Sequence, residues 1–397
     1  MTGVNRHPLP HGNVSSFADG RTEIHAAGGR TYQVDTHGRL LRYSSQDTQA
    51  VFRTNGEWSS IQKHNMVIKR GSNGGRRIES NQSDGSLLVS QGSNSGYLER
   101  RATVAGRPGV ERTYYRNGSS YRRTYQTYDR SGVSMQAYVP PVRFSPNYLN
   151  WMSTGWSSAV SYDWGMSGEP WYNAYGRYWA PAPSYTDPAM WVVDWELGQI
   201  LEQAYKEDGT PGKAASQPIS EQDKEQLAKQ VADRERFLAS PSGQSDPGSA
   251  SHVMLAPGEV FVVSDSLSVQ VRGQDCELTA GDFLRLTAAV PGNSASAAVI
   301  VADSKPSDCA RDSQVEISVQ DLQNMHNVFL DRQDGALRMF SLKQGRDGLP
   351  TAPNASITVT DRAPKDEGVG QQLENQQREA GQTEQELLNS LYPDEHA

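Results

Sequence analysis

Turn-forming residues recur every nine positions near the start of this 397-residue chain. They are Gly20, Gly29, Gly38, Asp47, Gly56, Asn65 and Gly74. Short runs that alternate apolar and polar residues, such as residues 31–35 and 40–43, separate these turns. A fixed short period of this kind indicates antiparallel strands joined by tight hairpin turns. The sequence therefore predicts a β-meander with nine-residue units over residues 19–140.

Two-residue turns would fix the register of this meander, because opposed residues then share one face of the sheet. The pairs predicted on one face are Tyr32–Tyr43, Val34–Leu41, Leu41–Phe52, Tyr43–Ala50, Ala50–Ile61 and Phe52–Ser59. The opposite face would carry Gln33, Arg42, Gln49 and Ser60. One face is thus mostly apolar and the other polar, as in a sheet with one packed side. We expect the aromatic-rich chain that follows to cover the apolar face.

A calcium-binding β-roll is an alternative for a nine-residue period. Such rolls need a Gly-Gly-x-Gly-x-Asp pattern whose oxygens ligate the ion. The units here lack that pattern, and arginine often opens them. The sequence therefore favours a meander without metal, and no cofactor is predicted.

The charge is divided unevenly along the chain. Residues 1–143 contain 20 Lys/Arg and 10 Asp/Glu, whereas the remainder contains 18 and 36. The basic N-terminal region could attract a polysaccharide or another anionic polymer, or could pair with the acidic rear. Residues 112–116 and 121–125 interleave cations with tyrosines, a pattern also found in nucleic-acid strips. We disfavour nucleic acid, because strand alternation favours cross-strand Tyr–Arg stacking instead.

Beyond the meander, the composition changes several times. Apolar residues make up only 36% of the chain, and 57 residues are Gly or Pro, which favours β-structure and linkers over a helical enzyme core. The predicted parts are a flexible N-terminus (1–18), the meander (19–140), an aromatic-rich segment (141–207), a linker (208–252), a small β-domain (253–353) and a disordered tail (354–397). The predicted fold class is therefore mainly β.

Helix signals fall at four places. Asp187 and Pro188 begin a helix that ends the aromatic-rich segment. Ser220, with Asp223 as its capping-box partner, begins a helix over 220–239 inside the linker. Ser318 begins the one helix of the small β-domain, with a transient helix around 384–391 in the tail.

The small β-domain contains five predicted strands. They are Val260–Val263, Leu267–Val271, Phe283–Thr287, Ala298–Val301 and Val315–Val319. Five short strands and a helix suggest a small open barrel or a sandwich, folded as a separate module. Residues 240–252 are rich in Ser, Gly and Pro and are expected to be a flexible linker before it.

The aromatic-rich segment holds the candidate ligand site. Seven of the eight tryptophans fall in it. The candidate ligand-binding residues are Asp163, Trp164, Glu169, Trp171, Tyr172, Tyr175, Tyr178 and Trp179. Sugars stack on exposed indoles, and a carboxylate pair can act as acid and base, so a carbohydrate-binding or glycoside-cleaving site is one interpretation. A packed core explains the same rings, because each buries 150–250 Å² or so.

Catalytic and metal-binding signatures are missing from the sequence. It contains no H-E-x-x-H, no G-x-S-x-G, no Walker loop and no C-x-x-C pair. Gly71–Gly75 and Gly92–Gly96 have the glycines of such loops but Asn at the central position, so they are predicted turns. No catalytic residue or metal ligand is assigned, and a non-enzymatic protein is favoured.

Two cysteines, Cys276 and Cys309, lie in one C-terminal segment. They are either buried free thiols or a disulfide that closes a loop, which would place the protein in an oxidising compartment. No stretch is long and apolar enough for a transmembrane helix, and Met1–Phe17 is not a signal peptide. The protein either stays inside the cell or lost an export signal before this numbering begins.

Tyr162-Asp163-Trp164-Gly165, Pro170-Trp171-Tyr172 and Tyr175-Gly176-x-Tyr178 resemble a family of uncharacterised bacterial proteins with a Tyr/Trp/Gly-rich middle. The similar stretch covers about residues 110–210, and residues 276–326 also match. The units over 32–43 resemble the Tyr-Asp wrapping repeats of large bacterial shell proteins. The resemblance implies an exported protein of the extracellular space, periplasm or cell envelope, and implies no activity.

From these features we expect an exported structural or binding protein with an extended β-sheet and aromatic surface. Long meanders leave edge strands, so self-association through them is also expected. The leading alternative is a carbohydrate-binding or carbohydrate-cleaving protein, and an intracellular enzyme is the third.

Overall fold

The structure is a computed structural model that describes residues 11–71, 75–92, 95–116, 118–208, 217–353, 355–359 and 368–391. Strands hold 35% of the residues and helices 32%, which confirms a mainly β protein with an antiparallel meander. The chain divides into unit 1 (1–101, 111–122 and 365–397) and unit 2 (102–110 and 123–364). Gly74 and parts of the predicted N-terminus, linker and tail lie outside the described residues.

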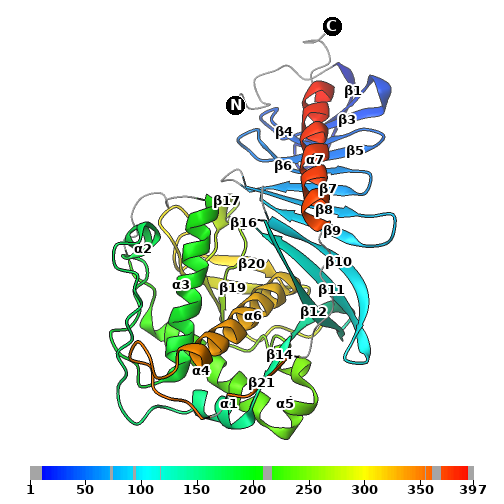
Figure 1. Cartoon of the computed structure of the whole chain (residues 1–397). Coiled ribbons are helices and arrows are strands. Elements are labelled where there is room, and N and C mark those ends of the chain that lie inside the picture. The colour runs from blue at the N-terminus through cyan, green and yellow to red at the C-terminus, as the bar shows by residue number, and fades with distance from the viewer. Residues whose placement is uncertain are drawn as a thin grey trace. The chain divides into compact units, whose positions relative to one another are not determined.

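Thirteen strands follow one another in one antiparallel sheet, in the order of the sequence. They are β1 (Gly12–Ser16), β2 (Thr22–Ala26), β3 (Arg30–Val34), β4 (Leu40–Ser44), β5 (Thr48–Phe52), β6 (Trp58–Lys63), β7 (Met66–Arg70), β8 (Arg76–Asn81), β9 (Leu87–Gln91), β10 (Ser95–Val104), β11 (Arg107–Arg116), β12 (Ser119–Arg130) and β13 (Val133–Val139). The predicted meander is therefore confirmed (Figure 1).

The nine-residue spacing conceals an alternation of two turn types. Four five-residue loops (17–21, 35–39, 53–57 and 82–86) share one hydrogen-bond pattern. In each, the first residue's N–H donates to the fifth residue's carbonyl oxygen, and the glycine at the fourth position donates to the first residue's carbonyl oxygen. These glycines have positive φ, from 76° to 86°, which Gly adopts without strain. Tighter turns follow β4 and β6. After β6, Lys63 pairs directly with Met66 of β7.

The five-residue loops shift the register that two-residue turns would give. Val34 pairs with Leu40 and Phe52 with Trp58, so the predicted partners Leu41 and Ser59 are each wrong by one position. A bulge in each strand pair absorbs the extra loop residue. Leu40 is consequently 2% exposed and belongs to the core, whereas its neighbour on β4 is only half-buried.

One apolar row crosses unit 1 from strand to strand. The successive partners are Ile24, Tyr32, Tyr43, Ala50, Ile61, Ile68, Ile78, Ser90 and Gly96. This row contains three of the predicted pairs: Tyr32–Tyr43, Tyr43–Ala50 and Ala50–Ile61. The prediction of one packed face is thus confirmed, because the row's members from Tyr32 to Ser90 are buried.

Helix α7 (Val369–Leu391) covers this apolar row. Ala380, Leu387 and Leu391 join the cluster of the row, and Val369 and Leu373 pack on Leu88, Leu98 and Tyr115. The prediction of a disordered tail with only a transient helix is therefore wrong for this segment. The expectation that the aromatic-rich segment covers the apolar face is also wrong, because the sheet's own C-terminal helix does so (Figure 1).

Polar contacts fix where α7 sits along the sheet. Gln376 is 3% exposed, its Nε2 donates to Ser80 Oγ (2.7 Å) and to the Leu88 carbonyl oxygen (2.9 Å), and its Oε1 accepts from Ser90 Oγ (2.5 Å). A Cβ on Gly96 would lie 2.3 Å from the Val89 carbonyl oxygen and 2.7 Å from Leu373 Cδ2, so a larger residue would clash with the neighbouring strand and with the helix side chain. Arg76 also pairs with Glu384 at 2.9 Å.

Unit 2 contains the other helices and three small sheets. Its helices are α1 (Pro146–Met152), α2 (Pro170–Tyr175), α3 (Pro188–Asp208), α4 (Glu221–Ala239), α5 (Pro241–Ser245), η3 (Pro247–Ser251) and α6 (Val319–Lys343). Its additional strands are β14 (Val142–Phe144), β15 (Val260–Val262), β16 (Leu267–Val271), β17 (Gln274–Leu278), β18 (Phe283–Leu286), β19 (Ser296–Asp303), β20 (Gln314–Ser318) and β21 (Ile357–Val359). The predicted helices near 188, 220 and 319 are therefore present.

The predicted linker is part of a core. Nine residues of α4 are buried, including the charged Lys224, Arg234 and Glu235, and residues 241–251 form α5 and η3 instead of a flexible linker. The Ser220 side chain makes no cap hydrogen bond, so the predicted capping box with Asp223 is wrong. Asp223 pairs with Arg285 of β18 at 2.9 Å.

The five strands predicted in the small β-domain are all found, and the sequence missed β17. The strands form a four-stranded sheet (β15-β18-β19-β20) and a β16–β17 hairpin, with no closed barrel among the described residues. Residues from η3 to β20 share a core with Met135 of β13, so this sheet is not a separate module. Ser318 caps α6 as predicted, its Oγ accepting from the Asp321 N–H at 3.0 Å.

Cys276 and Cys309 form a disulfide, with a Cα–Cα distance of 5.1 Å. Of the two alternatives for these cysteines, the structure therefore contains the disulfide. It joins β17 to the loop after β19, where the Cys309 N–H also donates to the Glu277 carbonyl oxygen at 2.7 Å.

Leu387→Ala should destabilise unit 1. Leu387 is 2% exposed against the apolar row, and truncating such a side chain costs about 2–5 kcal/mol. The adjacent Leu388 is 40% exposed and provides the matched control, since Leu388→Ala should change the free energy of unfolding by less than about 0.5 kcal/mol. Hydrogen exchange of β4–β7 amides measures both. Equal protection in the two variants would contradict the covering role of α7.

Candidate functional site

The predicted ligand-binding aromatics lie in the core of unit 2. Tyr178, Trp179, Tyr175 and Trp171 are between 0% and 7% exposed. Trp164 and Tyr172 are half-buried, and Trp164 stacks on Trp191 with ring centroids 5.8 Å apart. A ring needs an open face to stack on a sugar. This arrangement therefore favours the packing interpretation of the segment.

The two predicted carboxylates of this segment lie at the surface. Asp163 is exposed, and its Oδ1 accepts the Gly165 N–H at 3.0 Å to close a turn. Glu169 is also exposed and occupies the N-cap position of α2. Neither is buried beside a predicted ring.

A different carboxylate, Asp194 on α3, organises the aromatic cluster. Its Oδ1 accepts from Trp179 Nε1 at 3.1 Å, and its Oδ2 accepts from Tyr185 OH and the Ala182 N–H, both at 2.8 Å. Lys224 Nζ of α4 lies 2.9 Å from Oδ1, and both charged side chains are at most 2% exposed. A buried ion with this many partners is well compensated. Asp194 therefore holds the loop after α2 against α3 and α4.

A second buried polar cluster lies where α3, α4 and α6 meet. Arg234 of α4 pairs with Asp334 of α6 at 2.9 Å, and the hydroxyl of Tyr138 lies 2.9 Å from the other oxygen of Asp334. Glu196 of α3 and Glu235 of α4 are fully buried nearby. Burial raises the pKa of Glu196 well above its usual value and that of Glu235 to about 8.

Several atoms of this buried cluster lack a hydrogen-bond partner within the described part of the chain. They are both carboxylate oxygens of Glu196, Oε2 of Glu235, Oε1 of Gln333, and Nε and Nη2 of Arg234. Clustered perturbed carboxylates are found at active sites, but also in structural ion networks. The residues of this cluster come from separate elements far apart in the sequence, so no sequence motif could have revealed it.

The sheet of unit 1 presents a second face, opposite α7. Because side chains alternate along a strand, the partners next to the apolar row point away from the helix. They are Glu23, Gln33, Arg42, Val51, Ser60, Lys69, Arg77 and Gln91, each paired with the next across the sheet. We call this row the open face. Arg42 and Lys69 are exposed, and the row has three cations and one acid, Glu23, at its β2 end.

Tyrosines continue the same surface on β10–β12. Tyr114 stacks on Tyr121 with ring centroids 5.2 Å apart, and Tyr97 lies 5.2 Å from Tyr114. The Arg112 guanidinium lies 4.8 Å above the Tyr97 ring and donates to Glu99 Oε2 at 2.8 Å. This cross-strand stacking of rings and arginine is the arrangement that we expected from the sequence in place of a nucleic-acid-binding strip. The surface is thus a rigid ladder of rings and cations.

The described residues contain no group of three His, Cys, Asp or Glu that could hold a metal ion. A pocket of about 320 Å³ lies between the β5–β6 region and the end of α7, and Lys63 and Glu386 pair within it. No helix in the described ranges is long and apolar enough to span a membrane.

The chain matches no family model, and comparison with curated proteins and with solved structures finds no similar protein.

Glu235→Gln should make the stability of the protein less dependent on pH. The folded pKa of about 8 exceeds the unfolded value of 4.5, so the folded state keeps a proton that the unfolded chain releases. The contribution is fully present below pH 4.5 and is lost as pH rises toward 8. The wild-type free energy of unfolding should therefore fall over this range, by on the order of a few kcal/mol, and fall less in the variant.

Glu225→Gln is the matched control, because Glu225 is an exposed carboxylate on the same helix. Its pH profile should follow the wild type in denaturant titrations. Identical profiles for all three proteins would show that Glu235 is not protonated in the fold.

Proposed function

We propose that this protein is an exported, non-enzymatic binding protein whose open face holds an acidic polysaccharide. The observation that carries the proposal is the row of cations on a rigid sheet whose other face is closed by α7. A flat array of Arg42, Lys69 and Arg77 at strand spacing suits a polymer with repeated carboxylate or sulfate groups. The half-buried rings of Tyr114 and Tyr121 beside this array are the ones on which sugars can stack.

Charge distribution supports an anionic ligand at this face. Helix α7 carries four glutamates and one arginine, and it lies on the opposite side of the sheet. Its Glu384 and Glu386 pair with Arg76 and Lys63, cations whose side chains reach the helix. The open-face cations are therefore not the ones that α7 neutralises. The Arg77 guanidinium forms an ion pair with the Glu79 carboxylate of its own strand at 2.7 Å. This ion pair orients the guanidinium along the sheet.

Two observations support export. A disulfide such as Cys276–Cys309 persists mainly in oxidising compartments. The resemblance of residues 162–178 to exported bacterial proteins points the same way. Residue types at the open face need no cofactor, and the proposal includes none.

The double change Arg42→Glu with Lys69→Glu should abolish binding to sulfated or uronate polysaccharides. Wild-type binding should weaken as salt rises from 0.1 to 1 M, because the Debye length falls from about 10 Å to about 3 Å. Glycan-array binding and isothermal titration measure both effects. Lys229→Glu with Arg338→Glu changes two exposed cations of unit 2 by the same charge and should leave binding intact. Binding unchanged by the first pair would refute the assignment of the open face.

Self-association through β1 is part of the same proposal. All five residues of β1 are exposed, and it is the first strand of the sheet order, with a partner on one side only among the described strands. An edge of this kind can pair with a second copy. Val14→Lys, at a residue 64% exposed, should remove concentration-dependent association in light scattering, whereas Val51→Lys on the central strand β5 should not. A wild-type monomer at every concentration would exclude this part of the proposal.

A further inference from the structure

A lysine and two aspartates are enclosed together beside the disulfide. Lys305 follows β19, and Asp282 precedes the adjacent strand β18. The Nζ of Lys305 lies 2.6 Å from Asp282 Oδ1 and 3.3 Å from Asp308 Oδ2. The three side chains are 6%, 0% and 5% exposed. An amine and a carboxyl are thus in contact, with a second carboxyl next to the amine.

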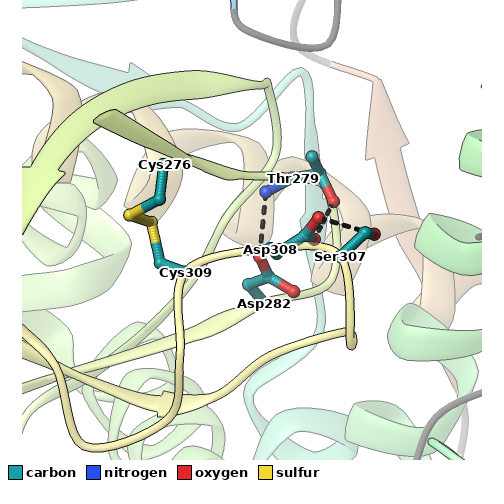
Figure 2. The surroundings of a disulfide bond; sticks show 6 residues. All are labelled: Cys276, Thr279, Asp282, Ser307, Asp308 and Cys309. Atoms are coloured by element: carbon teal, nitrogen blue, oxygen red, sulfur yellow. Dashed lines mark hydrogen bonds between the residues drawn. A yellow bond between two sulfur atoms is a disulfide. The ribbon is translucent and has the colours of Figure 1, made fainter. Parts of the chain in front are cut away.

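The surroundings hold these groups in place and exclude water. The Tyr178 ring lies 5.6 Å from Lys305 Nζ, and its hydroxyl donates to the Gly281 carbonyl oxygen at 2.9 Å. Asp282 Oδ2 accepts the Thr279 N–H at 2.9 Å, and Asp308 accepts the Thr279 hydroxyl proton. Figure 2 shows Asp308 beside Thr279 and Ser307, next to the disulfide and Asp282. Burial raises the pKa of Asp282 to about 7, so this carboxyl carries a proton for part of the time.

We propose that Lys305 and Asp282 become joined by an intramolecular amide bond, with Asp308 as the acid–base group. Asp308 takes a proton from the Lys305 ammonium, and the neutral Nζ attacks Cγ of protonated Asp282. The Nζ–Cγ bond forms, Asp308 returns the proton to the departing hydroxyl, and one water molecule leaves as the Cγ–O bond breaks. Asp308 then takes the remaining extra proton from Nζ, so it ends protonated and the amide is neutral. Atoms and charge balance without an oxidant, a metal or another reactant.

Enforced contact is what drives such a reaction. Groups held within reach of each other behave as if present at an effective concentration on the order of 10⁵ M or more. Burial also favours the protonated form of Asp282, because its carboxylate loses hydration inside the protein. The product amide is neutral and removes two ionisable groups from a buried site.

A second buried lysine–aspartate pair shows which features the proposed amide bond requires. Lys224 and Asp194 are equally buried and 2.9 Å apart. However, Asp194 also accepts from an indole and a phenol, whereas Asp282 accepts from the backbone N–H groups of Thr279 and Lys305. The other carboxylate near Lys224 belongs to Glu221, which is 3.9 Å away and 75% exposed. We therefore expect no amide bond at this pair, and it serves as an internal control.

Intact mass spectrometry of the full chain tests the proposal. After reduction and denaturation, the chain should be one water molecule lighter than its sequence mass. Tandem spectra should show the peptide containing Asp282 joined to the peptide containing Lys305, and no joined peptides for Lys224 and Asp194. A wild-type chain at full sequence mass would overturn the proposal.

Variants distinguish this bond from other losses of water, such as cyclisation at Asp84-Gly85. Lys305→Arg keeps the charge and the ion pair but should restore the full mass. Asp308→Asn leaves both reacting groups in place and should also give the full mass. Lys224→Arg should retain the loss of water. If the mass deficit persists in Lys305→Arg, the lost water comes from another site and the amide bond is excluded.

Discussion

The contact between α7 and one face of the meander is the interaction on which unit 1 depends. A single antiparallel layer cannot bury its own apolar side, so a sheet of this length needs a cover. The row from Tyr32 to Ser90 supplies the apolar surface, and α7 supplies Leu373, Ala380 and Leu387. Closing one face in this way leaves the other face available for binding, with its side chains held at strand spacing.

How much of this could be read from the sequence depends on the kind of signal. The meander could be predicted because its turns require residues that tolerate positive φ, and these recur at fixed spacing. The predicted partners of Val34 and Phe52 were wrong by one residue. A nine-residue period does not distinguish two-residue turns from five-residue loops with a bulge. The helices near Pro188 and Ser318 could be predicted because both have local start signals.

Helix α7 escaped prediction because its contact stripe is weakly apolar. Gln376 and Thr383 occupy buried positions of the stripe, and Ala380 contributes little area. Gln376 is stabilised by hydrogen bonds to the sheet, which only tertiary structure reveals. The place of α4 in the core was missed for a similar reason, since Lys224, Arg234 and Glu235 are residue types typical of an exposed helix face. The sequence identified the aromatic-rich segment. The exposure of its rings could not be inferred, because a packed core and a sugar-binding platform use the same residue types.

The position of α7 in the sequence also determines the order in which the protein can fold. Ser80 and the Gln376 that binds it are separated by 296 positions. A ribosome adds about 5–20 residues per second, so on the order of tens of seconds pass between synthesis of the strands and of the helix that shields them. During that interval the tyrosine and isoleucine row has no intramolecular cover. The nascent chain is therefore most vulnerable to misassociation before α7 emerges.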